Sequence, residues 1–347
     1  MSGSGSRTEQ SLTQAPEFRL AIIAVLVFAL MAVMSPDRFL SGQNLTSMAF
    51  QFPEFAILAL AMTITMTTGG IDLSVVGVAN LSAVIAATIL TSLVGPEAAG
   101  AAAFMWLAVA LVASLAVGAA AGFFNGILVS RLGLPPILAT LGSGLVFTGF
   151  AVAMTGGSAV MGFPDIVAVI GNATIWEIPV PLILFAILAI ALHILLTRTG
   201  FGLRVTMYGA NPLAALYAGI DIDRILLRVY VIAGMFSSVA GMVIMSRANS
   251  AKADYGSSYL LLAVLIAVLG GVNPYGGYGR VVGVVLAVLS MQFLSSGLNM
   301  LQVSNFAREL IWGALLLLVM VINTTNWAGL SARPTSRPRP AEREDTT

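Results

Sequence analysis

Long, uninterrupted apolar blocks are the feature that most restricts how this chain can fold. About ten such blocks follow one another, and most are close to the roughly 20 residues that a helix needs to cross the hydrocarbon core of a bilayer. We place them at 18–34, 47–68, 75–94, 101–128, 137–154, 179–197, 225–246, 258–272, 281–298 and 307–323. Because a soluble core of short elements would not give this pattern, the sequence predicts an all-α integral membrane protein with about ten transmembrane helices.

The composition agrees with this prediction. Hydrophobic residues make up 58% of the 347 residues and charged residues only 9%, against about 25% charged residues in soluble domains. A β-barrel is the other architecture that spans a bilayer, but its strands alternate between apolar and polar residues. The segment 182–192 (LILFAILAIAL) is apolar on every side, which favours helices.

The residue inventory excludes several kinds of chemistry. Without cysteine the chain cannot form disulfides, thiolate nucleophiles, or Cys-ligated zinc or iron–sulfur sites. Lys252 is the only lysine and follows Ala251, so no phosphate-binding G-x-x-x-x-G-K-[ST] loop exists. Any ATP that drives this protein must therefore be hydrolysed by another chain, and we expect this chain to bind no cofactor. The net charge of +1 gives no indication of a nucleic-acid partner.

The chain divides into one apolar domain between two polar tails. Residues 1–17 and 330–347 are polar and are predicted to be disordered, which leaves a single transmembrane domain at 18–329. The first apolar block is followed by Ser-Pro-Asp at 35–37 rather than by a small-x-small cleavage site. We therefore interpret this block as a retained span and not as a signal peptide.

The distribution of basic residues predicts the orientation, because cytoplasmic loops carry an excess of lysine and arginine. With the N-terminus in the cytoplasm, twelve basic residues lie inside, and an even number of spans also returns the arginine-rich C-terminal tail to the cytoplasm. The four basic residues left outside are Arg38, Arg247, Lys252 and Arg308. The connection at 155–178 is then external, and it carries two acidic residues and no basic residue.

A stripe of glycines runs along the block at 101–128. Gly118, Gly122 and Gly126 follow one another at intervals of four residues, so they share one face of a helix. Small residues in this arrangement allow two helices to approach closely in lipid. The stripe therefore predicts a close helix–helix contact rather than a ligand site.

The segment 67–74 (TTGGIDLS) joins two apolar blocks with almost no polar spacer. Gly69 and Gly70 are expected to break the helix, and Asp72 and Ser74 follow within a few residues of lipid depth. A carboxylate is costly at this depth and is often functional. The alternative is that Asp72 caps the next helix at the membrane surface, and the two roles are compatible.

A second glycine-rich interruption ends a later apolar block. It reads GGVN at 270–273 and continues with GGYGR at 276–280. Both glycine-rich turns lie on the cytoplasmic side in the predicted orientation. An internal duplication and two independent turns explain the similarity equally well.

The longest predicted cytoplasmic connection runs from Arg198 to Arg228. In its centre, Asn211 suits an N-cap and Pro212 suits the first helical position, while Gly219 suits the position after the helix. The pattern predicts a helix of about two turns outside the membrane. Taken alone, it also fits a plain surface helix whose flanking arginines bind lipid phosphates.

Three segments carry a family resemblance by their order and spacing. They are 68–74 (TGGIDLS), 125–142 (NG through LPPILATLG) and 209–220 (GANP through AALYAGI). Together they resemble the permease subunits of bacterial ABC importers for monosaccharides, of the ribose, xylose and arabinose type. The similarity extends from about Asn44 to Ile322, which is most of the chain.

The resemblance implies a type II ABC importer-like permease bundle in the bacterial inner (plasma) membrane. The implied partners are a second permease chain, identical or related, an ABC ATP-binding subunit that holds ATP and Mg²⁺, and a periplasmic sugar-binding protein. The resemblance also implies that the short helix is a coupling helix that contacts the ATPase. Its implied contact residues are Asn211, Pro212, Ala214, Ala215 and Gly219. Leu213 stands where this family usually has an acidic residue, which argues against a salt bridge to the ATPase there.

Two further groups of residues are predicted for such an importer. The binding protein is expected to dock on the external side, with contacts at Gln51, Glu54, Arg247, Lys252 and Asp254. The path of the sugar needs hydrogen-bonding groups that bind weakly enough to release it. The predicted path residues are Thr63, Thr67, Asn80, Ser82, Asn125, Gln292, Ser295, Ser296 and Asn299. For each serine or threonine, the alternative is a hydrogen bond to the backbone of its own helix.

Two other functional classes fit the sequence less well. An ion-coupled secondary transporter would need several intramembrane carboxylates or a broken-helix ion site. Only Asp72 is suitably placed, since Glu54 and Glu309 are predicted to lie at the membrane surface. An intramembrane enzyme is not favoured, because His193 is the only histidine and no H-E-x-x-H metal site can form.

Overall fold

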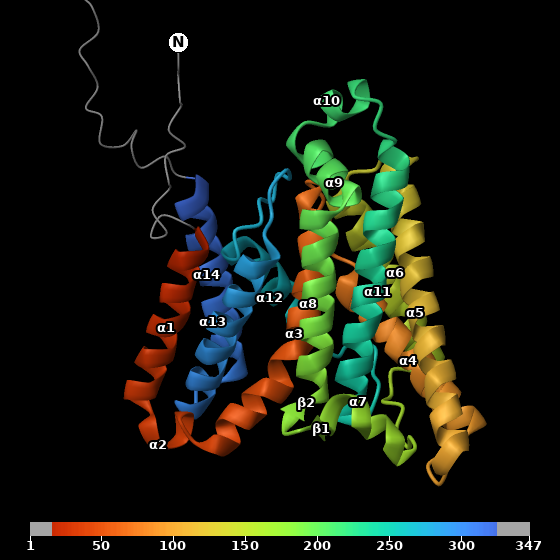
Figure 1. The fold of residues 1–347 in the computed structure, drawn as a ribbon. Helices are drawn as coiled ribbons and strands as arrows, with labels where there is room; N and C mark the ends of the chain where they lie inside the picture. Colours follow the sequence, from red (N-terminus) through yellow and green to blue (C-terminus); the bar gives the residue numbers. More distant parts are fainter. Residues whose placement is uncertain (1–15, 325–347) are drawn as a thin grey trace, which may run out of the picture.

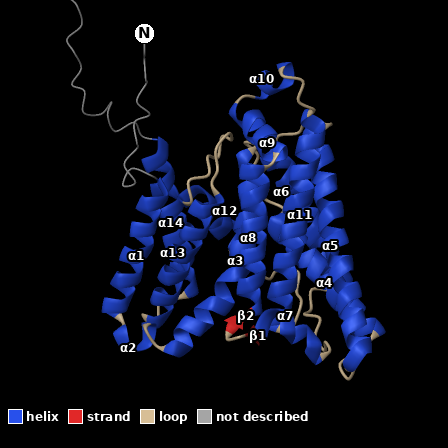
Figure 2. Cartoon of the chain, in the orientation of Figure 1, coloured by secondary structure: helices blue, strands red, loops and turns tan. Residues whose placement is uncertain are grey.

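The computed structural model describes residues 16–324, and their regular structure is almost entirely helical (Figure 2). Eight of the described helices are long and apolar enough to cross a membrane. They are α1 (Pro16–Met34), α3 (Gly42–Thr67), α4 (Val75–Leu93), α5 (Gly100–Ser130), α6 (Pro136–Thr155), α8 (Val180–Arg198), α11 (Ile222–Ala248) and α13 (Val281–Met300). The prediction of an all-α multi-pass membrane protein is confirmed.

Two more helices occupy the remaining predicted spans. The first, α12 (Tyr259–Leu269), is a shorter apolar helix that ends before the glycine pair at 270–271. The second, α14 (Asn305–Thr324), covers the apolar block at 307–323. Each predicted span therefore coincides with a helix, while the number of ten crossings and the orientation stay predictions.

Short elements lie at the two ends of the bundle (Figure 1). At one end, α9 and α10 extend beyond the long helices, and α2, α7 and the strand pair β1–β2 lie at the other. Their bounds are α2 (Pro36–Phe39), the 3₁₀ turn η2 (Asp165–Val167), α7 (Ala168–Asn172), β1 (Thr174–Ile175), β2 (Ile178–Pro179), α9 (Gly200–Ala210) and α10 (Pro212–Tyr217). The predicted tails fall outside the described residues, apart from the two residues at 16–17 that begin α1.

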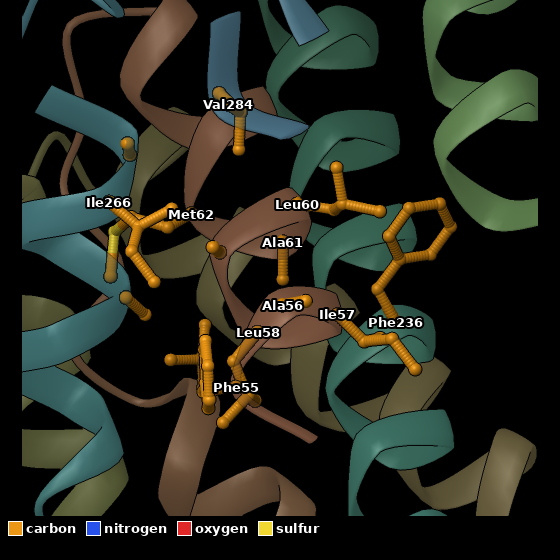
Figure 3. Close-up of a cluster of buried hydrophobic side chains, with 14 of the residues drawn as sticks. Phe55, Ala56, Ile57, Leu58, Leu60, Ala61, Met62, Phe236, Ile266 and Val284 are labelled. Carbon is orange, nitrogen blue, oxygen red and sulfur yellow. The ribbon is translucent and has the colours of Figure 1, made fainter. Parts of the chain in front are cut away.

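Helix α3 forms the centre of the bundle. Every residue from Phe52 to Thr67 is buried, as expected for a helix that is hydrophobic on all sides. In Figure 3, the middle of α3 packs among Phe236 of α11, Ile266 of α12 and Val284 of α13. A displacement of either end of α3 would therefore act on these three neighbouring helices.

Helices α5 and α11 approach each other closely along the glycine stripe. A Cβ atom added to Gly118 would lie 2.4 Å from the carbonyl oxygen of Gly234, and one added to Gly122 would lie 2.1 Å from that of Tyr230. At Gly126 the nearest atoms, at 3.0 Å, belong to Leu227. Because no larger side chain fits between the two backbones, the predicted close contact is confirmed.

The outer helices present apolar side chains to their surroundings. Val112 of α5, Leu145 of α6 and Ile190 of α8 are each at least 60% exposed. A soluble protein rarely exposes apolar surface on this scale. The pattern fits a bundle whose outer face is covered by lipid.

The long connection between α6 and α8 is attached to the end of α11. The backbones of Val160 and Ala251 pair with each other, and the Ser246 hydroxyl accepts a hydrogen bond from the Gly171 amide at 2.7 Å. The same hydroxyl donates to the carbonyl oxygen of Val167. These bonds hold the connection against the end of the bundle opposite α10.

Candidate functional site

The predicted two-turn helix is present as α10. The Asn211 side chain caps it by accepting a hydrogen bond from the Ala214 amide at 3.0 Å, and Pro212 is its first residue. Gly219 follows the helix with a φ of +74°, a backbone conformation that glycine adopts readily. Ala214 is exposed, whereas Ala215 is buried against the rest of the chain.

The outer surface of α10 is unusually apolar for a short, exposed helix. Leu213 is 66% exposed and Tyr217 is 88% exposed, although α10 extends beyond the bundle (Figure 1). Exposed apolar groups that are gathered in one place mark protein–protein contacts. The surface of α10 is therefore suited to contact another protein.

Three segments that are distant in the sequence meet at the base of α10. The Gly277 amide, in the turn before α13, donates to the carbonyl oxygen of Thr67 at 3.0 Å. A Cβ atom added to Gly209 of α9 would lie 2.0 Å from that oxygen, and one added to Gly276 would lie 2.7 Å from the Gly69 nitrogen. The two glycine-rich turns, which the sequence left unconnected, thus pack on each other and on α9.

Asp72 lies inside the protein, in the connection between α3 and α4, and is 2% exposed. Its carboxylate accepts hydrogen bonds from the Ser74 amide at 2.9 Å and the Ser74 hydroxyl at 2.6 Å. The Asn125 side chain donates to the same hydroxyl at 2.7 Å. Burial raises the pKa of the Asp72 carboxyl, against the opposing effect of the bonds from Ser74. The carboxylate therefore orders the turn before α4, whose N-cap is Ser74, and its depth in the membrane stays a prediction.

Three of the predicted path residues form the alternative hydrogen bond, to the backbone of their own helix. The hydroxyl groups of Thr63, Thr67 and Ser82 donate to carbonyl oxygens of their own helices at 2.7–2.9 Å. All three side chains are also buried, so in this structure their hydroxyl groups are satisfied by the backbones of their own helices.

Other predicted path residues connect separate segments. The Asn80 amide donates to the carbonyl oxygen of Ala253 at 2.8 Å, and the Ser296 hydroxyl donates to the Asn44 side chain at 2.9 Å. Asn299 lies exposed near the end of α13. Their place on a path between two permease chains stays a prediction.

A polar cavity of about 380 Å³ lies between α3, α11, α12, α13 and α14, toward the end opposite α10. It gathers residues that the sequence analysis had placed in two separate groups. Its lining includes Gln51, Glu54 and Arg247 from the docking group and Gln292 and Ser295 from the path group. We refer to it as the polar cavity.

Glu54 connects three helices beside the polar cavity. Its carboxylate binds Arg247 of α11 at 2.7 Å and the hydroxyl of Tyr259 at the start of α12 at 2.7 Å. Only 9% of its side chain is exposed, so Glu54 is enclosed by the protein, while its depth in the membrane stays a prediction. The other predicted docking pair, Lys252 and Asp254, forms an exposed ion pair at 2.9 Å outside the cavity lining.

Sequence reasoning missed the two aromatic residues of the polar cavity that can form hydrogen bonds, Tyr259 and Trp312. Trp312 is the only tryptophan within the predicted last span, and a polar aromatic group among aliphatic residues was the available signal. Among residues 16–324, no cluster of three or more His, Cys, Asp or Glu side chains is arranged to hold a metal ion. The cavity therefore offers hydrogen bonds and aromatic surface.

Comparison with known proteins identifies the family. Residues 44–320 match the family described as branched-chain amino acid transport system / permease component. Similar proteins include the autoinducer 2 import system permease protein LsrD of Klebsiella pneumoniae subsp. pneumoniae, which is 34% identical over 309 residues, covering 87% of this chain and 90% of that protein. The ribose import permease protein RbsC of Bacillus subtilis is 33% identical over 310 residues, covering 89% and 91% of the two chains.

A third relative is the D-allose transport system permease protein AlsC of Escherichia coli, with 30% identity over 302 residues, covering 87% and 89% of the two chains. No solved structure matches the chain. The relatives confirm the resemblance to sugar-importer permeases that three short segments had indicated. Since the family match covers most of its length, this chain belongs to the family of branched-chain amino acid transport system permease components.

Proposed function

We propose that this chain is the transmembrane permease subunit of an ATP-driven importer, and that it forms the path of a monosaccharide or similar small polyol across the inner membrane. The observation that carries the proposal is α10, a capped helix with an exposed apolar surface that extends beyond the bundle. Relatives named for the import of ribose and autoinducer 2 and for the transport of D-allose support the choice of solute.

The proposed assembly contains several other chains. A second permease, identical or related, forms the other wall of the path, and an ATP-binding subunit holds ATP and Mg²⁺. A periplasmic sugar-binding protein delivers the solute to the side opposite α10. The absence of a phosphate-binding loop from the sequence supports placing ATP hydrolysis on the ATP-binding subunit.

The packing at the base of α10 supplies a route for coupling. A displacement of α10 moves α9, because Asn211 is both the C-cap of α9 and the N-cap of α10. Gly209 of α9 rests on the backbones of Thr67 and Gly277, so the displacement reaches the ends of α3 and α13. Helices transmit such motion as rigid bodies, and the same two helices line the polar cavity.

The structure offers little support for an ion-coupled transporter. Among the described residues, the buried carboxylates are Glu54 and Asp72. Glu54 is neutralised by Arg247, and Asp72 is bound by the amide and hydroxyl of Ser74. Within the part of the chain that the structure describes, neither carboxylate belongs to a group of three or more acidic, histidine or cysteine side chains that could hold a metal ion. The ATP-driven importer is therefore the better supported function.

The coupling role of α10 is tested with a matched pair of variants. Gly219 and Gly133 both have positive φ angles, of +74° and +64°, and a Cβ atom added to either meets open space. Both lie in connections at the α10 end of the bundle. Gly219→Arg and Gly133→Arg therefore introduce the same bulk, charge and backbone strain, but only the first lies beside α10.

The measurement is solute-stimulated ATP hydrolysis by the importer reconstituted with its ATP-binding and solute-binding proteins. We expect Gly219→Arg to lose most of the stimulation, because the new side chain blocks the contact with the ATP-binding subunit, and Gly133→Arg to retain it. Full stimulation of the Gly219→Arg importer would contradict the coupling role.

A further inference from the structure

Two hydrogen-bond donors beside the polar cavity lack an acceptor. The Gln292 side-chain nitrogen and the Trp312 indole nitrogen are buried, and neither donates to any of the described residues. Their residues are only 2% and 8% exposed, and both residues line the cavity. A buried donor without an acceptor costs about 1–3 kcal/mol, and native proteins rarely leave one unsatisfied. Each of the two donors therefore needs an oxygen atom that the described residues do not supply.

The charges around the cavity balance. Two arginines, Arg247 and Arg308, face two glutamates, Glu54 and Glu309, so their formal charges cancel. An ionic ligand would lose its hydration without gaining a net opposite charge, which is costly in a confined site. The lining therefore favours a neutral ligand over an anion or a cation.

The shape and the remaining groups narrow the chemistry further. The volume of about 380 Å³ lies in the range of roughly 300–1,000 Å³ that is usual for small-molecule sites. The Gln51 amide and the Ser295 hydroxyl both donate and accept hydrogen bonds, and Trp312 adds an aromatic ring. Hydroxyl groups on every carbon of a polyol match such donors and acceptors, while its C–H groups match an aromatic ring.

We infer that the polar cavity binds a neutral polyhydroxylated solute, of the size of a monosaccharide, within a single permease chain, with Gln292 and Trp312 donating to its oxygen atoms. This inference rests on the proposed function and adds to it a defined substrate site. The site lies beside Glu54, which holds α3, α11 and α12 together. A change in the relative positions of these helices would open or close the site.

The test removes each donor with the smallest change in side-chain volume that the natural residues allow. Gln292→Leu and Trp312→Phe are the cavity variants, and Ser295→Ala is a third on the half-buried face of α13. Gln43→Leu, at an exposed position of α3, and Trp176→Phe, at a residue that is 94% exposed, repeat the same changes away from the cavity. All variants are assembled into the complete importer in proteoliposomes.

Uptake of radiolabelled D-ribose, D-allose and autoinducer 2 is measured together with ATP hydrolysis. For whichever solute the wild type transports, each cavity variant is expected to move about two- to tenfold less per ATP hydrolysed, the effect of one lost hydrogen bond. The two control variants should match the wild type. Basal ATP hydrolysis shows that each variant has assembled.

The outcomes separate the inference from the proposed function. If the cavity variants transport as well as the controls, the cavity is not a substrate site, although the importer function stands. If the wild type imports none of the three solutes with ATP, the proposed function fails. If Gln292→Leu and Trp312→Phe fail to assemble and Ser295→Ala does assemble, Ser295→Ala decides the test. The inference is overturned if this variant imports as much solute per ATP hydrolysed as the wild type.

Discussion

Replacing Gly209 by alanine tests the contact that joins α9 to both glycine-rich turns. The added Cβ atom would lie 2.0 Å from the carbonyl oxygen of Thr67 and 2.4 Å from the nitrogen of Gly277. Both neighbours are backbone atoms, and they form a hydrogen bond with each other: the Gly277 amide donates to the Thr67 carbonyl oxygen at 3.0 Å. The methyl group cannot be accommodated by rotating a side chain, so the two turns must move apart.

The expected cost follows from three contributions. Overpacking of a tight contact costs about 1–3 kcal/mol, and loss of the hydrogen bond between the two turns adds about 1 kcal/mol. Alanine in a helix offsets up to about 1 kcal/mol of this, because it restricts the unfolded chain more than glycine does. We therefore expect Gly209→Ala to lower the free energy of unfolding by about 1–3 kcal/mol.

The assay is unfolding of the purified chain by SDS in mixed detergent micelles, followed by circular dichroism. Gly142→Ala is the matched control, because Gly142 lies inside α6 and a Cβ atom there meets nothing within 4 Å. This control should be as stable as the wild type or slightly more stable. Equal stability of Gly209→Ala and Gly142→Ala would refute the proposed packing at the base of α10.

Three further predictions concern single side chains. Tyr217→Ala should leave the free energy of unfolding within about 0.5 kcal/mol of the wild type, because the residue is exposed. It should nevertheless reduce solute-stimulated ATP hydrolysis. Unchanged stimulation would argue against a contact between Tyr217 and the ATP-binding subunit. Glu54→Gln should cost about 1–3 kcal/mol in SDS unfolding, because Arg247 loses a partly buried partner. Lys252→Ala, in an exposed ion pair, should leave the SDS unfolding transition where it is in the wild type, and equal effects of the two variants would contradict this difference. Burial raises the pKa of Asp72 in the folded chain. The free energy of unfolding of the wild type should therefore fall relative to that of Asp72→Asn as the pH rises above about 4. If the free energies of unfolding of the two proteins change with pH in parallel, Asp72 is not buried.

Much of the fold could be predicted, because every helix that crosses a bilayer needs an apolar segment of about the same length. The blocks of roughly 20 residues coincide with helices, and the glycine stripe of α5 marks its contact with α11. The block at 258–272 was predicted to be longer than the helix that forms, because its apolar character continues past Leu269 while the glycine pair ends the helix. Local capping signals also predicted α10 correctly.

The polar cavity could not be predicted, because its residues come from helices that are far apart in the sequence. Glu54 meets Arg247 across 193 positions and Tyr259 across 205 positions, and no local pattern specifies such pairs. The sequence named Glu54 and Gln292 but assigned them to different tasks. Thr63 and Thr67 look like path residues by composition alone, and only the structure shows that their hydroxyl groups bind their own helix.

The energy source for transport tests the central claim most directly. Proteoliposomes that contain the complete importer are loaded with ATP or left without it, and uptake of D-ribose, D-allose and autoinducer 2 is followed with and without an uncoupler. The account predicts uptake that continues in the presence of the uncoupler and stops when ATP is withheld. Uptake without ATP, driven by an imposed proton or sodium gradient, would contradict it.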